Sequence, residues 1–299
     1  MSSAPGPAFP ACSAPPGSPP GIFRPWQARS VGFIFLQKSC RGYSIFIMIG
    51  NIKEQLQNGA VLAGPIFSNN APDLVESAAL GGFSFVIFDL EHSSMSLDAL
   101  PGLTRAAECR GMAPLVRVSN SDPSTILKAL DCGVHGIVVP QVNTPEQARR
   151  IVRSCHYYPL GERGFGLVRA SAYGSVPVTD YFAEVRDKLL VIAQCESAEG
   201  LDNLEEIAAV PAIDAIFLGP FDLSQSLGIP GETGHPRIRE AAGRIDKVCG
   251  REQKIAGVFS INGEDARRRA QEGFSFIALG TDHTLFASAV KREVEAFGR

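Results

Sequence analysis

Eight short apolar runs alternate with amphipathic stretches from residue 60 to the end of the chain, and this alternation constrains the fold most. The runs are rich in Val, Ile and Phe and are apolar nearly throughout, which is typical of strands buried on both faces of a sheet. They occupy residues 60–66, 83–89, 113–118, 135–140, 189–195, 213–218, 255–260 and 274–279.

The stretches between the apolar runs have helical periodicity, over residues 71–80, 96–110, 122–132, 145–155, 200–209, 236–250, 263–272 and 284–297. Strands that alternate with helices build right-handed βαβ units around a parallel sheet. Eight such units in about 250 residues close most economically into a (β/α)8 TIM barrel, a single α/β domain. An open doubly wound sheet is the alternative, but no GxGxxG follows the first strand to support its dinucleotide-binding form.

The first 47 residues differ in composition from the rest, and we predict that the barrel occupies residues 48–299. Residues 1–20 are dense in Pro, Ala, Ser and Gly, and the first acidic residue is Glu54. An acid-free leader that contains Arg and Ser is typical of an organellar transit peptide. The alternative is a start codon assigned too early, with translation from Met48. We therefore expect an unstructured or artefactual extension on a cytoplasmic protein, or on a mitochondrial one if the leader is genuine.

Charge and cysteine content exclude several classes of partner. The chain has 28 Lys and Arg against 31 Asp and Glu, so it lacks the basic excess of a nucleic-acid-binding protein. Its apolar stretches at 31–36 and 45–49 are far shorter than the roughly 20 residues of a membrane span. The 7 Cys residues are scattered without CxxC or Cys–His metal spacing, and we interpret them as reduced thiols. We expect neither nucleic acid nor a membrane as a partner.

Polar side chains follow most of the predicted strands. In a barrel the chemistry lies at the carboxyl ends of the strands, so these side chains are expected at one rim. They are Asp89, Glu91 and His92 of "IFDLEHSS", then Arg117, Gln141, Gln194, Glu196, Asp222 and residues 280–283. The segment 156–188 is longer than a barrel connection needs, and its Gly-rich "PLGERGFG" predicts an active-site loop.

Four of these residues have both a functional and a structural interpretation. Glu196 and Asp222 follow neighbouring strands and would suit a hard divalent cation, or each could cap the helix after it. Arg117 is either a fork for a substrate oxygen or half of a structural ion pair. His92 is either a general base beside two acids or an ordinary hydrogen-bonded histidine. No P-loop, GxSxG motif or strand-end Lys supports the NTPase, serine hydrolase or Schiff-base chemistries.

Residues from about 50 to 297 resemble the HpcH/HpaI family of metal-dependent aldolases that act on 2-oxo acids. The resemblance implies a (β/α)8 barrel that forms homo-oligomers, dimers or hexamers, with the last helix exchanged between subunits. It rests on "FDLEHSS" (88–94), "PLVRVSNSDPSTILKALDCGVHGIVVPQVNTPEQAR" (114–149), "YYPLGERGFG" (157–166), "AQCESAEGLDNLEEI" (193–207) and "IFLGPFDLSQSLG" (216–228).

The resemblance also implies roles. Glu196 and Asp222 match metal ligands for Mg²⁺, Mn²⁺ or Co²⁺, and Arg117 matches the residue that binds the 2-oxo oxygen. His92 matches the acid/base group, while Asp89 and Asp131 match acids linked to it. The expected binding residues for the 2-oxo acid are Arg117, Gln194, Phe221 and Asp222.

Two positions depart from the pattern. Leu90 stands where many members have Gly, and Gln141 stands where Met or Phe is frequent. Both lie near the predicted rim, so the aldehyde half of the substrate is expected to differ.

Together these features predict reversible cleavage of a 4-hydroxy-2-oxo acid to pyruvate and an aldehyde through a metal-stabilised enolate. A second hypothesis is a lyase of β-hydroxyacyl-CoA esters, as in citrate-lyase-like relatives. A third is a barrel retained for binding or assembly without catalysis.

Overall fold

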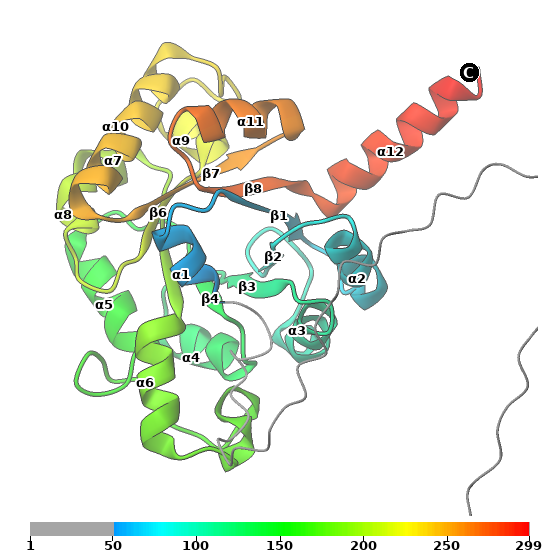
Figure 1. Ribbon diagram of the computed structural model, residues 1–299. Helices are drawn as coiled ribbons and strands as arrows, with labels where there is room; N and C mark the ends of the chain where they lie inside the picture. The colour runs from blue at the N-terminus through cyan, green and yellow to red at the C-terminus, as the bar shows by residue number, and fades with distance from the viewer. Residues whose placement is uncertain (1–50, 299) are drawn as a thin grey trace, which may run out of the picture. The chain divides into compact units, whose positions relative to one another are not determined.

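The computed structural model describes residues 51–298, so the predicted extension 1–47 lies outside the described residues. Eight parallel strands close into a barrel in the order β1-β2-β3-β4-β5-β6-β7-β8, which confirms the predicted fold (Figure 1). Their bounds differ from the predicted ones by at most two residues. The strands are β1 (Leu62–Phe67), β2 (Phe85–Asp89), β3 (Ala113–Arg117), β4 (Gly136–Val139), β5 (Leu190–Cys195), β6 (Ala215–Leu218), β7 (Ile255–Ser260) and β8 (Phe276–Thr281).

Helices surround the barrel, and several of them begin with a proline in the first turn. Pro occupies the first turn of α2, α3, α4, α5, α9 and α10, where its missing N–H costs nothing. The helices are α1 (Ile52–Gln57), α2 (Pro72–Leu80), α3 (Leu100–Glu108), α4 (Pro123–Asp131), α5 (Pro145–Cys155), α6 (Val178–Lys188), α7 (Ala198–Asp202), α8 (Leu204–Ala208), α9 (Pro220–Ser226), α10 (Pro236–Glu252), α11 (Gly263–Gln271) and α12 (Asp282–Ala296).

Several features of the helical layer differ from the prediction, and one of them is α9, which was not among the predicted helices. The stretch 200–209 forms two short helices, α7 and α8, that meet at Asn203. The segment 156–188 contains the full helix α6, which the prediction treated as loop. Its Tyr181 and Val185, spaced four residues apart, are buried, so the amphipathic signal was present but weak among charged neighbours.

Aromatic side chains fill the interior of the barrel. The rings of Phe85 and Phe276 stack at 4.3 Å, and Phe217 packs edge-on against Phe276 at 6.0 Å. Gly64 makes room for this packing, because a Cβ there would lie 2.0 Å from the backbone oxygen of Phe85. The interior is therefore a packed core, and chemistry is confined to the barrel's ends.

The two ends of the barrel are closed differently. At the amino end, α1 covers the strands, and Lys53 forms a buried ion pair with Asp214 at 2.9 Å. At the carboxyl end, α12 follows β8 and extends away from the barrel, with Asp282 its only buried residue (Figure 1). Among the described residues, no helix is both long and apolar enough to span a membrane.

Candidate active site

A cavity of about 390 Å³ opens at the carboxyl ends of the strands. Of the residues predicted for the site, Asp89, His92, Arg117, Gln194, Phe221 and Asp222 all line it. The remaining lining residues are Ile66, Ser68, Phe217, Gly219, Pro220, Phe259, Thr281 and His283. Most of the predicted rim residues thus share one pocket, but Glu91, Gln141 and Glu196 are not among its lining residues.

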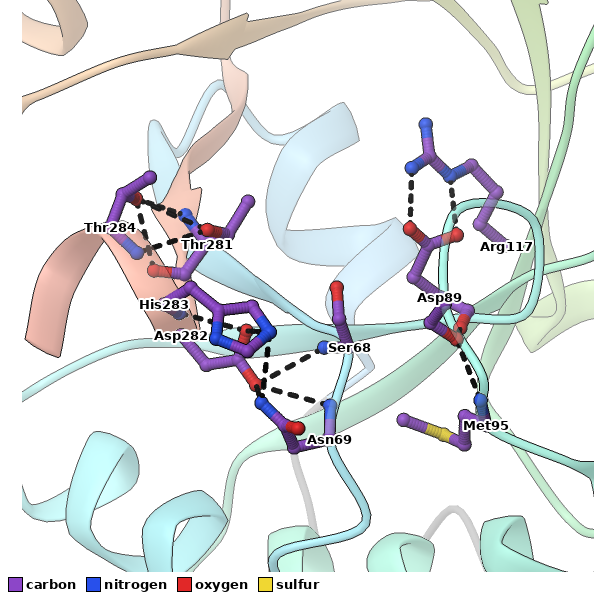
Figure 2. Close-up of polar contacts among 10 residues, drawn as sticks. Ser68, Asn69, Asp89, Met95, Arg117, Thr281, Asp282, His283 and Thr284 are labelled. Atoms are coloured by element: carbon purple, nitrogen blue, oxygen red, sulfur yellow. Dashed lines mark hydrogen bonds and ion pairs between the residues drawn. The ribbon is translucent and has the colours of Figure 1, made fainter.

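Arg117 and Asp89 form a bidentate ion pair in this pocket. They are register partners at the ends of β3 and β2. Nε and Nη2 of Arg117 donate to Oδ1 and Oδ2 of Asp89 at 2.9 and 2.7 Å (Figure 2). Burial alone would raise the pKa of Asp89, but the guanidinium holds that pKa below its usual value. The structural interpretation of Arg117 is confirmed, and no described residue bonds to its Nη1, which remains for a ligand.

Glu91 and His92 continue from Asp89 into the loop. The backbone N–H groups of both donate to Asp89 Oδ1, at 3.0 and 3.3 Å. Burial raises the pKa of Glu91, although Arg117 at 3.4 Å opposes that shift. The His92 ring is 59% exposed, and its Nε2 lies 3.7 Å from Glu91 Oε2. His92 is therefore a largely exposed pocket-lining group with an acid nearby, an arrangement compatible with proton transfer.

Glu196 lies behind the pocket wall and is almost fully buried. Its Oε1 accepts the backbone N–H of Gln141 at 2.8 Å, and its Oε2 accepts the side-chain amide of Gln194. Gln141 presents that N–H from a left-handed backbone conformation, φ 54°. The helix-capping interpretation of Glu196 is wrong, because the cap of α7 is Ser197, whose hydroxyl accepts from Gly200. Burial raises the pKa of Glu196 to about 7, and the acids Glu91 and Asp222 add to the shift.

The residues present fit a divalent cation completed by substrate and water. Asp222 lies in the first turn of α9, whose N-cap Gly219 makes no side-chain cap bond. A Cβ at Gly219 would lie 2.7 Å from Glu196 Oε2, so the glycine keeps space open beside that carboxylate. No group of three or more His, Cys, Asp or Glu in the described part of the chain could hold a metal by itself. Mg²⁺ commonly takes one or two carboxylates and completes its shell with substrate and water oxygens.

Asp131 is not brought into this pocket. It ends α4, and its Oδ1 accepts from Arg163 Nη2 at 2.8 Å. Arg163 belongs to the "PLGERGFG" segment, which follows α5 and packs against α4 and α5. No residue of 156–188 lines the pocket at the carboxyl ends, so the active-site loop prediction is wrong for the single chain. The segment does not reach the pocket because it joins α5 to the amino end of β5, whereas the pocket lies at the carboxyl ends of the strands.

Ser68 and Phe259 line the pocket although they were not among the strand-end residues expected at the rim. Ser68 follows β1, which the sequence predicts to end at residue 66, and Phe259 is a half-buried aromatic residue of β7. Thr281 and His283, which were expected at the rim, lie at the β8–α12 junction and do line the pocket. A polar "SNN" directly after the first strand was the signal that could have found this side of the pocket.

The fold and the site define a class of protein: a (β/α)8-barrel enzyme whose pocket sets one arginine among several carboxylates. The chain belongs to the HpcH/HpaI aldolase/citrate lyase family, which matches residues 66–289. The motif resemblance is thereby confirmed, and the chain is a carbon–carbon lyase of this family.

Named relatives agree with this assignment. The hydroxypyruvate/pyruvate aldolase of Chromohalobacter salexigens is 38% identical over 224 residues, which cover 74% of this chain and 87% of the relative. The 2-keto-3-deoxy-L-rhamnonate aldolase of Escherichia coli strain K12 is 35% identical over 250 residues, 82% of this chain and 92% of the relative. A crystal structure of a family member from Burkholderia cenocepacia superposes with a TM-score of 0.78 at 29% identity, over 83% of this chain and 98% of that one.

Proposed function

We propose that this enzyme reversibly cleaves a 4-hydroxy-2-oxo acid into pyruvate and an aldehyde. The observation that carries the proposal is the pairing of Arg117 with Asp89 in one pocket with Gln194 and Asp222. A guanidinium nitrogen without a partner and a cluster of carboxylates supply, respectively, a donor for an oxyanion and oxygens for a cation. Names of relatives that include pyruvate and 2-keto acids support the same substrate class.

We propose Glu196 and Asp222 as the residues that hold a divalent cation, Mg²⁺, Mn²⁺ or Co²⁺. When bound, such a cation would act as a Lewis acid toward the carboxylate and 2-oxo oxygens of the substrate. Gln194 holds Glu196 in place through its amide nitrogen, and the backbone of Gln141 holds the other carboxylate oxygen. The carbonyl oxygen of Gln194 is buried without a hydrogen bond to a described residue, so it can accept from a ligand.

Arg117 stabilises the developing oxyanion, and His92 transfers the proton. Cleavage of the C3–C4 bond leaves negative charge on the former 2-oxo oxygen, and Nη1 of Arg117 is the donor available to it. Asp89 keeps the guanidinium rigid, so little reorganisation is needed as that charge develops. His92 takes the proton of the 4-hydroxyl group, and Glu91 stabilises the imidazolium that forms.

Proton exchange into pyruvate tests this function without knowledge of the aldehyde. The purified protein is stripped of metal, supplied with Mg²⁺, Mn²⁺ or Co²⁺, and incubated with pyruvate in D₂O while the methyl signal is followed by NMR. We expect a metal-dependent loss of the signal. Absence of exchange with every cation would rule against a pyruvate aldolase and direct the search to CoA thioesters.

A further inference from the structure

The pocket contains a second polar group, built by the first and last strands of the barrel. Ser68 and Asn69 follow β1, while Asp282 and His283 begin α12 directly after β8. The two strands pair with each other to close the barrel, so residues 214 positions apart become neighbours. Ser68 and His283 both line the cavity.

Asp282 holds this group together from a buried position. Its Oδ2 accepts the backbone N–H groups of Ser68 and Asn69 at 3.2 and 3.1 Å and the Asn69 amide at 2.8 Å (Figure 2). Its Oδ1 accepts the backbone N–H of His283 at 2.9 Å. A carboxylate only accepts hydrogen bonds, so Asn69 must turn its Nδ2 and not its oxygen toward Asp282.

That orientation of Asn69 determines where His283 carries its proton. Asn69 Nδ2 lies 3.1 Å from His283 Nε2, and a nitrogen that faces an amide donor must accept. In this arrangement the ring hydrogen lies on Nδ1. Asp282 Oδ1 is 4.0 Å from Nε2, too far for a competing hydrogen bond. No described residue accepts from Nδ1, so His283 presents one free donor.

The order of strands places this donor on the side of the barrel away from the 2-oxo acid. Arg117, Gln194 and Asp222 belong to the sector from β3 to β6, whereas β8 and β1 close the other side of the ring. A substrate whose 2-oxo acid end lies against Arg117 therefore extends its aldehyde half toward His283.

We propose that His283 recognises the aldehyde half, donating from Nδ1 to an oxygen on the carbon next to the aldehyde carbon. Asn69 and Asp282 are positioning residues for it. The inference rests on the proposed function and deepens it, because it names the preferred substrates: 4-hydroxy-2-oxo acids that release a 2-hydroxyaldehyde and not a plain alkanal.

The test compares two acceptor aldehydes that differ by one hydroxyl group. Glycolaldehyde and acetaldehyde are each condensed with pyruvate in the presence of Mg²⁺, and the ratio of their kcat/KM values is the readout. A general loss of activity cancels in this ratio. The wild type should favour glycolaldehyde, and His283→Phe should lower the ratio by about 3- to 10-fold, the effect of one neutral hydrogen bond. His283→Asn, which keeps a donor nitrogen close to the position of Nδ1, should preserve most of the preference.

Further variants separate the possible outcomes. Asn69→Leu should lower the ratio in the same direction, because the ring is then free to carry its proton on Nε2. His235→Asn, at a helix cap outside the pocket, should leave the ratio at its wild-type value. An unchanged ratio in His283→Phe would overturn the proposal. So would a wild type that exchanges pyruvate protons but uses both aldehydes equally, whereas a wild type without exchange would refute the proposed function itself.

Discussion

Arg117 forms the ion pair with Asp89 and also has the proposed role of binding the substrate oxyanion, which affects how that role can be tested. Asp89 is 2% exposed, so deletion of the guanidinium would leave a buried carboxylate without its charged partner. Such losses commonly cost about 3–5 kcal/mol. A loss of activity in an alanine variant could therefore reflect either unfolding or lost catalysis. A variant that retains the positive charge is needed to distinguish the two.

Arg117→Lys is expected to lower kcat/KM by about 100- to 1000-fold, the usual cost of removing one donor from a developing oxyanion. Lysine keeps the charge beside Asp89 but cannot bind it with two nitrogens and also serve a ligand. Steady-state kinetics with thermal unfolding as a check on the fold would measure this. Arg110→Lys is the matched control, because Arg110 binds Glu76 through two nitrogens at the exposed surface. Wild-type turnover in Arg117→Lys would refute the role.

Glu196 is expected to make the metal-free protein less stable as pH rises from about 4.5 to about 7. Its pKa is raised from 4.5 to about 7 in the folded state, so the folded protein binds more protons than the unfolded chain in that window. Stability is then highest below the unfolded pKa and declines until the carboxyl is fully ionised. The upper limit is about 3 kcal/mol, at about 1.4 kcal/mol per pKa unit.

Denaturant unfolding at pH 5 and pH 8 would measure this effect. Glu196→Gln should lose less stability than the wild type between the two values, while Glu146→Gln at an exposed site should behave as the wild type does. Equal losses in the wild type and Glu196→Gln would show that the buried carboxyl does not titrate in this range.

At the scale of elements, α1 is a short helix that is anchored by a buried ion pair as well as by the apolar side chains of Ile52 and Leu56. Lys53 reaches across the barrel floor to Asp214 at 2.9 Å and donates to the backbone oxygen of Leu189 at 3.3 Å. Burial raises the pKa of Asp214 even though Lys53 opposes that shift. A helix of 6 residues is marginal by its own propensity, so these tertiary contacts hold it.

Lys53→Met is expected to lower the free energy of unfolding by about 3–5 kcal/mol, because Asp214 would remain buried and unpaired. The double variant Lys53→Met, Asp214→Asn should recover part of this loss. Urea unfolding followed by circular dichroism would measure both. Lys291→Met, at a position with a 77% exposed side chain, should have a negligible effect. A loss in Lys53→Met no larger than in Lys291→Met would contradict the role of the pair.

At the scale of the whole molecule, α12 carries several apolar side chains with a large exposed fraction. Phe286, Val290, Val294 and Phe297 are 68%, 43%, 45% and 78% exposed. Their spacing of four, four and three residues places them on one face of the helix. An apolar stripe of this kind is typical of a protein–protein contact. The homo-oligomer stays a prediction, and this stripe is its candidate contact.

The double variant Phe286→Ser, Phe297→Ser is expected to shift the protein toward smaller oligomers. Sedimentation velocity over a range of protein concentrations would measure the change. Lys291→Ser, whose side chain pairs with Glu295 elsewhere on α12, should leave the distribution as in the wild type. The same distribution in all three proteins would exclude this face from assembly.

The sequence alone determined the barrel and most of one side of the pocket. Strand and helix periods are local properties, so the eight runs predicted the eight strands to within two residues. Residues such as Asp89, Arg117, Gln194 and Asp222 could be assigned to the rim because every parallel strand delivers its carboxyl end to the same face.

Only the tertiary structure decided which of these side chains hold one another. Asp131 pairs with Arg163 away from the pocket, and Glu196 is held by Gln141 and not by the helix after it. The contact of Asn69 with His283 depends on closure between the first and last strands, across 214 positions. Which side chains become partners depends on their distance and burial in the folded protein. The local periodicity of the sequence carries no information about such long-range contacts.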